Sequence, residues 1–204
     1  MQYFLKRSLR FLKRSIWWYS HKNLFKRLGE KSYIYNPLNI TPSCIDCGKN
    51  VSIYKHCRIQ GIYRYNSKSF SPEIIIEDNV SIQQNLHLTC GNLIKIGENT
   101  AIAANVTITD IHHPYEDIFT PIERQDIVVK AVKIGRNCKI YNNAVILPGC
   151  EIGDHVTIAA NSVVTKNILD YSVAVGAPAK IVKRYNFDTH QWTKTNSDGS
   201  FINT

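Results

Sequence analysis

A six-residue period predicts an all-β protein built from stacked parallel coils. Aliphatic residues recur at every sixth position, small residues follow four positions later, and Gly, Asn or Asp fill the places between them. A step of six fits neither the 3.6-residue period of a helix nor the alternation of an isolated strand. It fits a short strand followed by a turn, and three such units close one coil of about 18 residues.

The aliphatic positions are expected to face inward and form continuous ladders. Burial of an aliphatic side chain contributes about 1.5–3 kcal/mol, and neighbouring coils supply the backbone hydrogen bonds. The longest run is Ile134, Ile140, Ile146, Ile152, Ile158 and Val164. Shorter runs are Ile96, Ile102 and Ile108, and Ile76, Ile82 and Leu88. The small inward position is expected at Cys138, Ala144, Cys150, Val156 and Ser162.

The six cysteines are expected to be reduced thiols. A chain of 204 residues with 44% hydrophobic residues can form a core without disulfides. Cys44 and Cys47 form a CxxC pair, but no second ligand pair accompanies it, and a structural zinc site needs four ligands. Cys138 and Cys150 fall on the small inward position and are predicted to pack in the core.

The net charge of +9 is concentrated at the N-terminus. Residues 1–28 hold eight Lys or Arg and no acidic residue, and Leu5, Leu9, Leu12, Ile16 and Trp17 recur at helical spacing. This pattern predicts a basic amphipathic helix that either contacts an anionic membrane surface or packs on the β-coils. Nucleic acid is not expected as a partner, because no nucleic-acid-binding module follows.

Three regions are expected along the chain. They are the basic helical segment 1–28, the coils over 29–181, and a C-terminal helix and tail over 182–204. A helix from about Val182 to Trp192 would cover the open edge of the last coil. Residues 111–131 interrupt the period as a long excursion, and such loops are usually functional.

The excursion begins with a candidate catalytic group. The run Asp110-Ile111-His112-His113-Pro114 leaves a coil, and a histidine titrates near neutral pH, which suits a general base. The residues alone leave open the alternative that both histidines are ordinary surface residues of a polar loop.

From Asn85 to Lys183 the sequence resembles the hexapeptide-repeat O-acetyltransferases, in the maltose, galactoside and nodulation-factor branch. It is most similar to the O-acetyltransferases of bacterial surface polysaccharides. The residues that carry the resemblance are the hexads, the run Asn105-Val106-Thr107 before the excursion, and the ending Gly176-Ala177-Pro178-Ala179-Lys180. The resemblance implies a left-handed parallel β-helix.

The resemblance also implies a set of site residues. His113 would be the general base and Asp110 would orient or polarise the site, whereas Asn85 and Tyr115 would contact the acceptor. Acetyl-CoA would be the co-substrate, and no metal would be needed. The residues implied for the coenzyme are Asn142, Ala160, Thr165, Lys166, Lys180 and Lys183. Tyr141 departs from the family pattern, because a small residue is usual there.

The implied partners are two further copies of the chain and a glycan or sugar acceptor. No apolar stretch reaches the roughly 20 residues that span a bilayer, and no signal-peptide pattern is present. The expected location is therefore the cytoplasm, with peripheral contact at the inner face of the cell membrane. Two rival hypotheses are a γ-class carbonic anhydrase-like metalloenzyme, which needs three histidines around zinc, and a non-catalytic β-helix scaffold.

Overall fold

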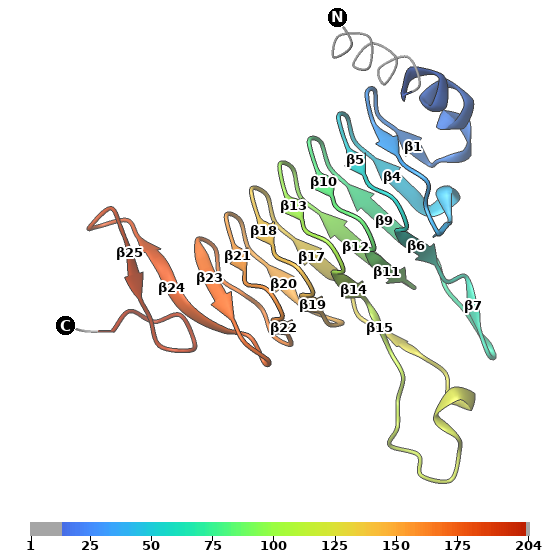
Figure 1. The fold of residues 1–204 in the computed structure, drawn as a ribbon. Coiled ribbons are helices and arrows are strands. Elements are labelled where there is room, and N and C mark those ends of the chain that lie inside the picture. The colour runs from blue at the N-terminus through green and yellow to red at the C-terminus, as the bar shows by residue number, and fades with distance from the viewer. Residues whose placement is uncertain (1–13, 203–204) are drawn as a thin grey trace, which may run out of the picture.

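The computed structural model describes residues 14–202, and these wind into a parallel β-helix (Figure 1). Its walls are three parallel sheets, here named A, B and C, and the chain visits them in that order in each coil. Sheet A contains β1 (Arg27–Leu28), β4 (Ile45–Cys47), β9 (Glu73–Ile76), β12 (Leu93–Ile96), β17 (Val132–Ile134) and β20 (Glu151–Ile152). The predicted coil architecture is confirmed.

Sheets B and C repeat the same spacing. Sheet B contains β2 (Tyr33–Ile34), β5 (Ser52–Ile53), β10 (Ser81–Ile82), β13 (Ala101–Ile102), β18 (Lys139–Ile140), β21 (Thr157–Ile158) and β23 (Ser172–Val175). Sheet C contains β3 (Asn39–Ile40), β6 (Arg58–Gly61), β11 (His87–Cys90), β14 (Thr107–Thr109), β19 (Val145–Ile146) and β22 (Val163–Val164). Equivalent residues of successive coils pair directly, as Ile82 does with Ile102 and Ile102 with Ile140.

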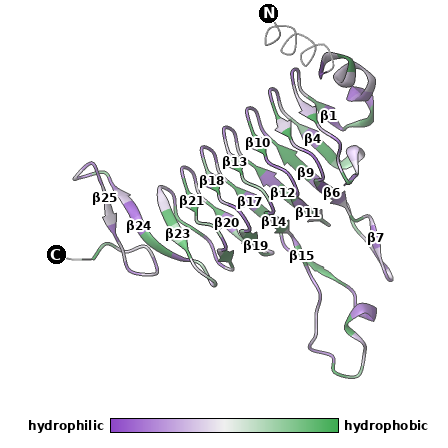
Figure 2. Cartoon of the chain, viewed as in Figure 1, coloured by the Kyte–Doolittle hydropathy of each residue, from purple (hydrophilic) through white to green (hydrophobic). Residues whose placement is uncertain are grey.

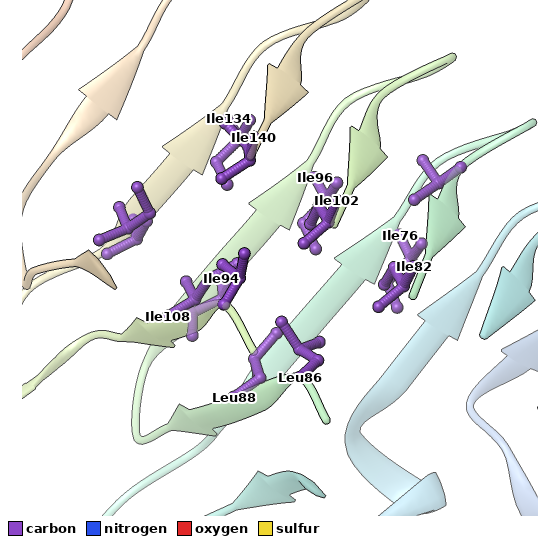
Figure 3. Close-up of a cluster of buried hydrophobic side chains, with 14 of the residues drawn as sticks. Ile76, Ile82, Leu86, Leu88, Ile94, Ile96, Ile102, Ile108, Ile134 and Ile140 are labelled. Carbon is purple, nitrogen blue, oxygen red and sulfur yellow. The ribbon is translucent and has the colours of Figure 1, made fainter. Parts of the chain in front are cut away.

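The predicted ladders form the core. Figure 3 shows Ile76, Ile96 and Ile134 stacked along sheet A beside Ile82, Ile102 and Ile140 of sheet B. Hydrophobic residues lie along the strands, with hydrophilic stretches at the turns (Figure 2). The predicted small positions are all buried: Cys138, Ala144, Cys150, Val156 and Ser162. All six cysteines are free and buried, and burial raises the pKa of Cys47 to about 12.

Backbone geometry explains which residues occupy the corners. Asn99 and Asn137, between sheets A and B, have φ of 58° and 57°, a left-handed conformation that Asn tolerates well. Gly135 allows close stacking there, because a Cβ on it would lie 2.5 Å from the carbonyl oxygen of Gly153.

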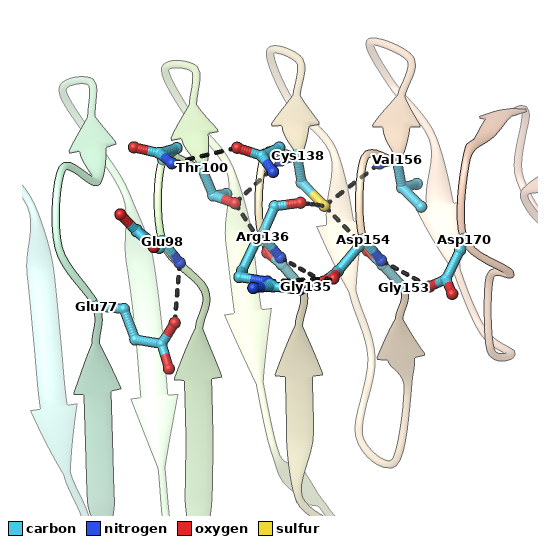
Figure 4. Close-up of polar contacts among 12 residues, drawn as sticks. Glu77, Glu98, Thr100, Gly135, Arg136, Cys138, Gly153, Asp154, Val156 and Asp170 are labelled. Atoms are coloured by element: carbon cyan, nitrogen blue, oxygen red, sulfur yellow. Dashed lines mark hydrogen bonds and ion pairs between the residues drawn. The ribbon is translucent and has the colours of Figure 1, made fainter.

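Side chains join successive coils at this corner (Figure 4). The Asp154 carboxylate accepts the backbone N–H of Arg136 at 2.8 Å, and Asp170 accepts the N–H of Asp154 at 2.8 Å. Thr100 donates its hydroxyl to the Gly135 carbonyl at 2.8 Å and accepts the N–H of Cys138 at 3.1 Å. These bonds satisfy backbone groups that the strands leave unpaired.

The N-terminal boundary differs from the prediction. A helix is present but ends at residue 21, η1 (Lys22–Leu24) follows, and Arg27–Leu28 already form β1. The indole N–H of Trp18 donates to the Gly29 carbonyl at 2.8 Å and seats the helix on the first coil. The predicted apolar positions Leu5, Leu9 and Leu12 lie outside the described residues.

The predicted C-terminal helix over 182–192 is wrong. Residues in this region form β24 (Lys180–Asn186) and β25 (Gln191–Lys194), an antiparallel hairpin that continues sheet B from β23. The open edge of β23 offers backbone hydrogen bonds that a helix could not use. Ile181 is buried against the last coil, and β-branched and aromatic residues favour the strand conformation.

Two excursions leave the corner between sheets C and A on the same side of the β-helix (Figure 1). The first is a hairpin of β7 (Arg64–Tyr65) and β8 (Lys68–Ser69). The second is residues 111–131, the catalytic-loop candidate, which contains β15 (Ile111–His112), η3 (Ile122–Arg124) and β16 (Val128–Val129). One strand of sheet C, β11, separates β6 from β14, the strands that lead into them. In residues 14–202 no helix is long and apolar enough to cross a membrane.

Candidate functional site

Asp110 anchors the base of the 111–131 excursion. Its side chain is fully buried, and the carboxylate accepts the backbone N–H groups of Gly91, Asn92 and Leu93 at 2.7, 2.7 and 2.9 Å. Its carbonyl oxygen accepts the N–H of Lys130 at 2.8 Å, where the excursion returns. Asp110 therefore ties the departing and returning chain to the preceding coil.

The thiol of Cys90 lies beside this carboxylate and donates to it at 3.4 Å. Burial and the neighbouring Asp110 together raise the pKa of Cys90 strongly. The thiol is therefore a hydrogen-bond donor in the core and has no nucleophilic character at neutral pH.

The two adjacent histidines diverge as the excursion begins. His112 pairs with Val128 across the β15–β16 ladder, and its ring meets that of Tyr115 at 6.0 Å between centroids. The ring of His113 instead packs in a T-shaped arrangement with the ring of Tyr65, with 5.3 Å between the centroids and 82° between the ring planes. Both histidines are exposed in the single chain, so either imidazole is accessible to a substrate.

Asn85 lies at the opposite edge of sheet C. Its φ is 62°, and its side-chain amide donates to Asn105 at 2.9 Å, which begins an asparagine ladder along the corner between sheets B and C. The ladder continues through Asn143 and Asn161 at 3.2 and 3.0 Å. About five residues of extended chain, or roughly 16 Å, separate this corner from the one that carries His113. Asn85 and His113 therefore do not meet within one chain.

The outer face of sheet C connects these two corners and is polar. Thr89 donates its hydroxyl to Thr109 at 3.0 Å, and Thr109 accepts the N–H of Ile111 at the start of the excursion. His87 stands on the same face beside Arg58, and partial burial followed by the Arg58 charge lowers the pKa of His87. Both causes favour the neutral form of the His87 imidazole.

The residues predicted for the coenzyme fall into three places, and all are exposed. Asn142 and Ala160 occupy the sheet B–C corner of adjacent coils, where the Asn142 carbonyl accepts the N–H of Asn161 at 3.0 Å. Thr165 and Lys166 lie at the C–A corner, directly after β22. Lys180 and Lys183 lie in β24.

Two further side chains bear on these predicted sites. Tyr115 is 64% exposed. Tyr141, the residue that departs from the family pattern, is 43% exposed with the Lys139 ammonium 5.5 Å from its ring centroid.

The sequence prediction missed the contact between the β7–β8 hairpin and the 111–131 excursion. Tyr65 donates its hydroxyl to the Glu123 carboxylate at 2.8 Å, and Ser67 donates its hydroxyl to Asp126 at 2.8 Å. Tyr63–Ser69 is identifiable as a loop from its sequence, but its partner lies almost 60 residues away. Within residues 14–202, no three His, Cys, Asp or Glu side chains gather in a way that could hold a metal ion.

Sequence and structure comparisons agree with this geometry. The family described as "Bacterial transferase hexapeptide (six repeats)" matches residues 131–166. The putative lipopolysaccharide biosynthesis O-acetyl transferase WbbJ of Escherichia coli is 36% identical over 128 residues, which cover 59% of this chain and 65% of that protein. The galactoside O-acetyltransferase of Escherichia coli is 33% identical over 127 residues, which cover 62% of each chain. The chain thus spans just under two thirds of the length of these relatives.

Two solved structures share the fold. The hexapeptide-repeat acetyltransferase VCA0836 of Vibrio cholerae, complexed with acetyl coenzyme A, superimposes with a TM-score of 0.59 at 24% identity over 83% of this chain and 76% of that one. The N-acyltransferase AntD of Bacillus cereus, complexed with dTDP and coenzyme A, gives a TM-score of 0.68 at 19% identity over 84% and 90%.

The fold class is therefore a left-handed parallel β-helix of hexapeptide repeats, as predicted. Over residues 131–166 the chain matches the bacterial hexapeptide-repeat transferases, and it resembles O-acetyltransferases of this kind over about 60% of its length.

Replacing Asp110 with Asn should destabilise the fold, because one amide oxygen replaces a carboxylate that accepts three backbone N–H groups. We expect a loss of about 2–4 kcal/mol in the free energy of unfolding, from the usual strength of hydrogen bonds to charged groups. Urea denaturation followed by circular dichroism measures it. Asp117→Asn, an exposed change in the same excursion, is the control, and equal stabilities for the two variants would contradict the anchoring role.

Proposed function

We propose that this chain is an O-acetyltransferase that moves an acetyl group from acetyl-CoA to a sugar hydroxyl of a bacterial surface polysaccharide or its precursor. The observation that carries the proposal is His113, held exposed at the start of an anchored excursion from a hexapeptide β-helix. The names of the relatives and the acetyl coenzyme A complex of VCA0836 support the donor. AntD has also been crystallised with a dTDP-linked amino sugar and coenzyme A, which supports a sugar acceptor.

The proposed reaction is a direct transfer. The imidazole of His113 takes the proton from the acceptor hydroxyl, and the oxygen attacks the thioester carbonyl. The new carbon–oxygen bond forms, the carbon–sulfur bond breaks, and the proton passes from His113 to the departing sulfur. A backbone N–H would stabilise the oxyanion. No acyl-enzyme forms.

Asp110 enters this proposal as a positioning residue. Three backbone amides occupy its carboxylate, so its contribution is to fix the point where the chain turns toward His113. Asn85 and Tyr115 are proposed to contact the acceptor.

The coenzyme is proposed to use the exposed residues of the later coils. Asn142, Ala160 and Thr165 would contact the pantetheine arm through backbone groups. Lys166, Lys180 and Lys183 would attract the phosphates, because exposed cations favour a phosphorylated ligand.

His113→Ala should lower turnover by about 10²–10⁴-fold, the usual contribution of a general base. The measurement is CoA release from acetyl-CoA with a panel of glycan and nucleotide-sugar acceptors. His112→Ala is the matched control, because its side chain is also exposed but turns toward Tyr115. A loss below tenfold in His113→Ala would remove this residue from the role of base. A wild-type chain that binds no CoA would favour the scaffold hypothesis.

We further propose a homotrimer whose active sites lie between neighbouring chains. Its support is the separation of Asn85 and His113 on opposite edges of sheet C, since closed rotational symmetry can bring one edge of a chain against the other edge of its neighbour.

Subunit mixing tests this arrangement. His113→Ala and Asn85→Ala should each be inactive alone, but a randomly mixed trimer should regain about one quarter of wild-type activity if each site takes one residue from each neighbour. Co-expression with two affinity tags provides the mixed species. Unmixed variants recombined after purification serve as the control. If the mixed trimers regain no activity, His113 and Asn85 do not act at one site from two different chains, and the shared-site arrangement is wrong.

The basic N-terminal segment is proposed to hold the enzyme at an anionic membrane on the cytoplasmic side. Trp18 already seats residues 14–21 on the first coil, so removal of residues 1–13 alone should leave the β-helix intact. This deletion removes four basic residues, Lys6, Arg7, Arg10 and Lys13, and should weaken binding to phosphatidylserine vesicles in cosedimentation. Binding equal to that of the full chain would refute membrane contact through this segment.

A further inference from the structure

The 111–131 excursion has little core of its own. All of its residues are described, and among them Ile127 is the one fully buried hydrophobic side chain. Gln125 closes the excursion from within by donating its amide to the carbonyl oxygens of Asp117 and Thr120 at 2.9 and 2.8 Å. A surface segment of this length with so few buried contacts depends on outside partners for its order.

The β7–β8 hairpin supplies these partners through its tip. Asn66 and Ser67 form a two-residue turn in which Asn66 has φ of 49°, the conformation that tight hairpins require. The Asn66 side-chain amide donates to the carbonyl oxygens of Glu123 and Gln125, both at 3.1 Å. Ser67 donates both its backbone N–H and its hydroxyl to the Asp126 carboxylate, at 3.3 and 2.8 Å.

Tyr65 connects this clamp to the histidine. Its hydroxyl donates to the carboxylate and to the carbonyl oxygen of Glu123, at 2.8 and 3.2 Å. Its ring packs in a T-shaped arrangement against the ring of His113, with 5.3 Å between the centroids. Because Glu123 fixes the hydroxyl, the orientation of the ring is fixed, and so is the surface that meets the imidazole.

The Tyr65 hydroxyl remains a donor across the working pH range. The Glu123 carboxylate raises the pKa of Tyr65, because ionisation of the phenol beside a carboxylate is unfavourable. The raised pKa keeps the phenol protonated, so that its hydroxyl can donate to Glu123.

We propose that the β7–β8 hairpin is a clamp for the catalytic excursion and that Tyr65 is the positioning residue for His113. This inference rests on the proposed role of His113 as general base. A base must be held closely to its reacting geometry, since a displacement of about 1 Å can cost roughly 10²-fold in rate. Tyr65 would hold the imidazole without touching the acceptor or the coenzyme.

Two substitutions separate the ring from the hydroxyl. Tyr65→Phe keeps the ring against His113 and loses the bonds to Glu123, whereas Tyr65→Ala loses both. Tyr63→Phe is the matched control, because Tyr63 lies beside the same hairpin but its hydroxyl bonds to Ser43.

We expect Tyr65→Ala to lower kcat by about 10–100-fold and Tyr65→Phe by about threefold to tenfold, with KM for acetyl-CoA changed less than about twofold. Tyr63→Phe should behave as wild type. The partial rescue by Phe and the kcat-selective loss distinguish positioning from general destabilisation, and melting temperatures are recorded for each variant. A kcat for Tyr65→Ala within twofold of wild type would overturn the inference, as would equal losses in kcat and coenzyme affinity.

A readout without substrate distinguishes this inference from the proposed function. The imidazole proton signals of His113, assigned by comparison with His113→Ala, should shift in Tyr65→Ala and stay in place in Tyr63→Phe, because an aromatic edge contact is lost only in the first. If wild type transfers no acetyl group but the signals shift, the clamp stands and the proposed function fails. If transfer is active and the signals do not move, the clamp fails alone.

Discussion

The direct pairing of equivalent positions in successive coils is the constraint on which the rest of the structure depends. Because Ile82, Ile102 and Ile140 lie in register, an inward position in one coil faces an inward position in the next. A slip of one residue would turn an entire ladder outward. The same requirement determines the corner residues. Asparagines with positive φ and glycines packed closely on the next coil allow the chain to turn without shifting the register between coils.

The stack of coils accommodates both long excursions at one of its three corners. The turns between sheets A and B and between sheets B and C keep their length from coil to coil, and side chains such as Asp154 and Asn105 bond along them. The corner between sheets C and A carries both excursions instead. The two excursions leave from β6 and β14, which are separated by the one intervening strand β11, and they meet beyond the wall and order each other. The coils therefore set the distance between the two excursions, and polar contacts hold the excursions to each other.

The sequence predicted what depends on local repetition. Ile134 to Val164 identified the coils, Cys138 and Cys150 were correctly placed inward, and the break in the period located the excursion. The segment from Ile181 to Trp192 could not be decided locally, because the free edge of β23 determines its conformation. The bond from Tyr65 to Glu123 was equally inaccessible, since neither residue carries a repeat and 58 positions separate them. Asp110 was recognised as important by resemblance, but its three amide partners come from a different coil.

The two ends of the β-helix have a shared consequence for assembly. A stack of identical coils has no intrinsic length, and its terminal strands offer the unpaired backbone on which fibres grow. At one end the helix over residues 14–21 lies on the first coil, with Trp18 bound to the Gly29 carbonyl. At the other, the β24–β25 hairpin reverses strand direction and replaces the parallel template of sheet B with a short antiparallel one. Each end of the stack thus carries a segment that differs from a coil, so a further parallel coil meets no matching strand in sheet B beyond β25 and meets a helix at the first coil.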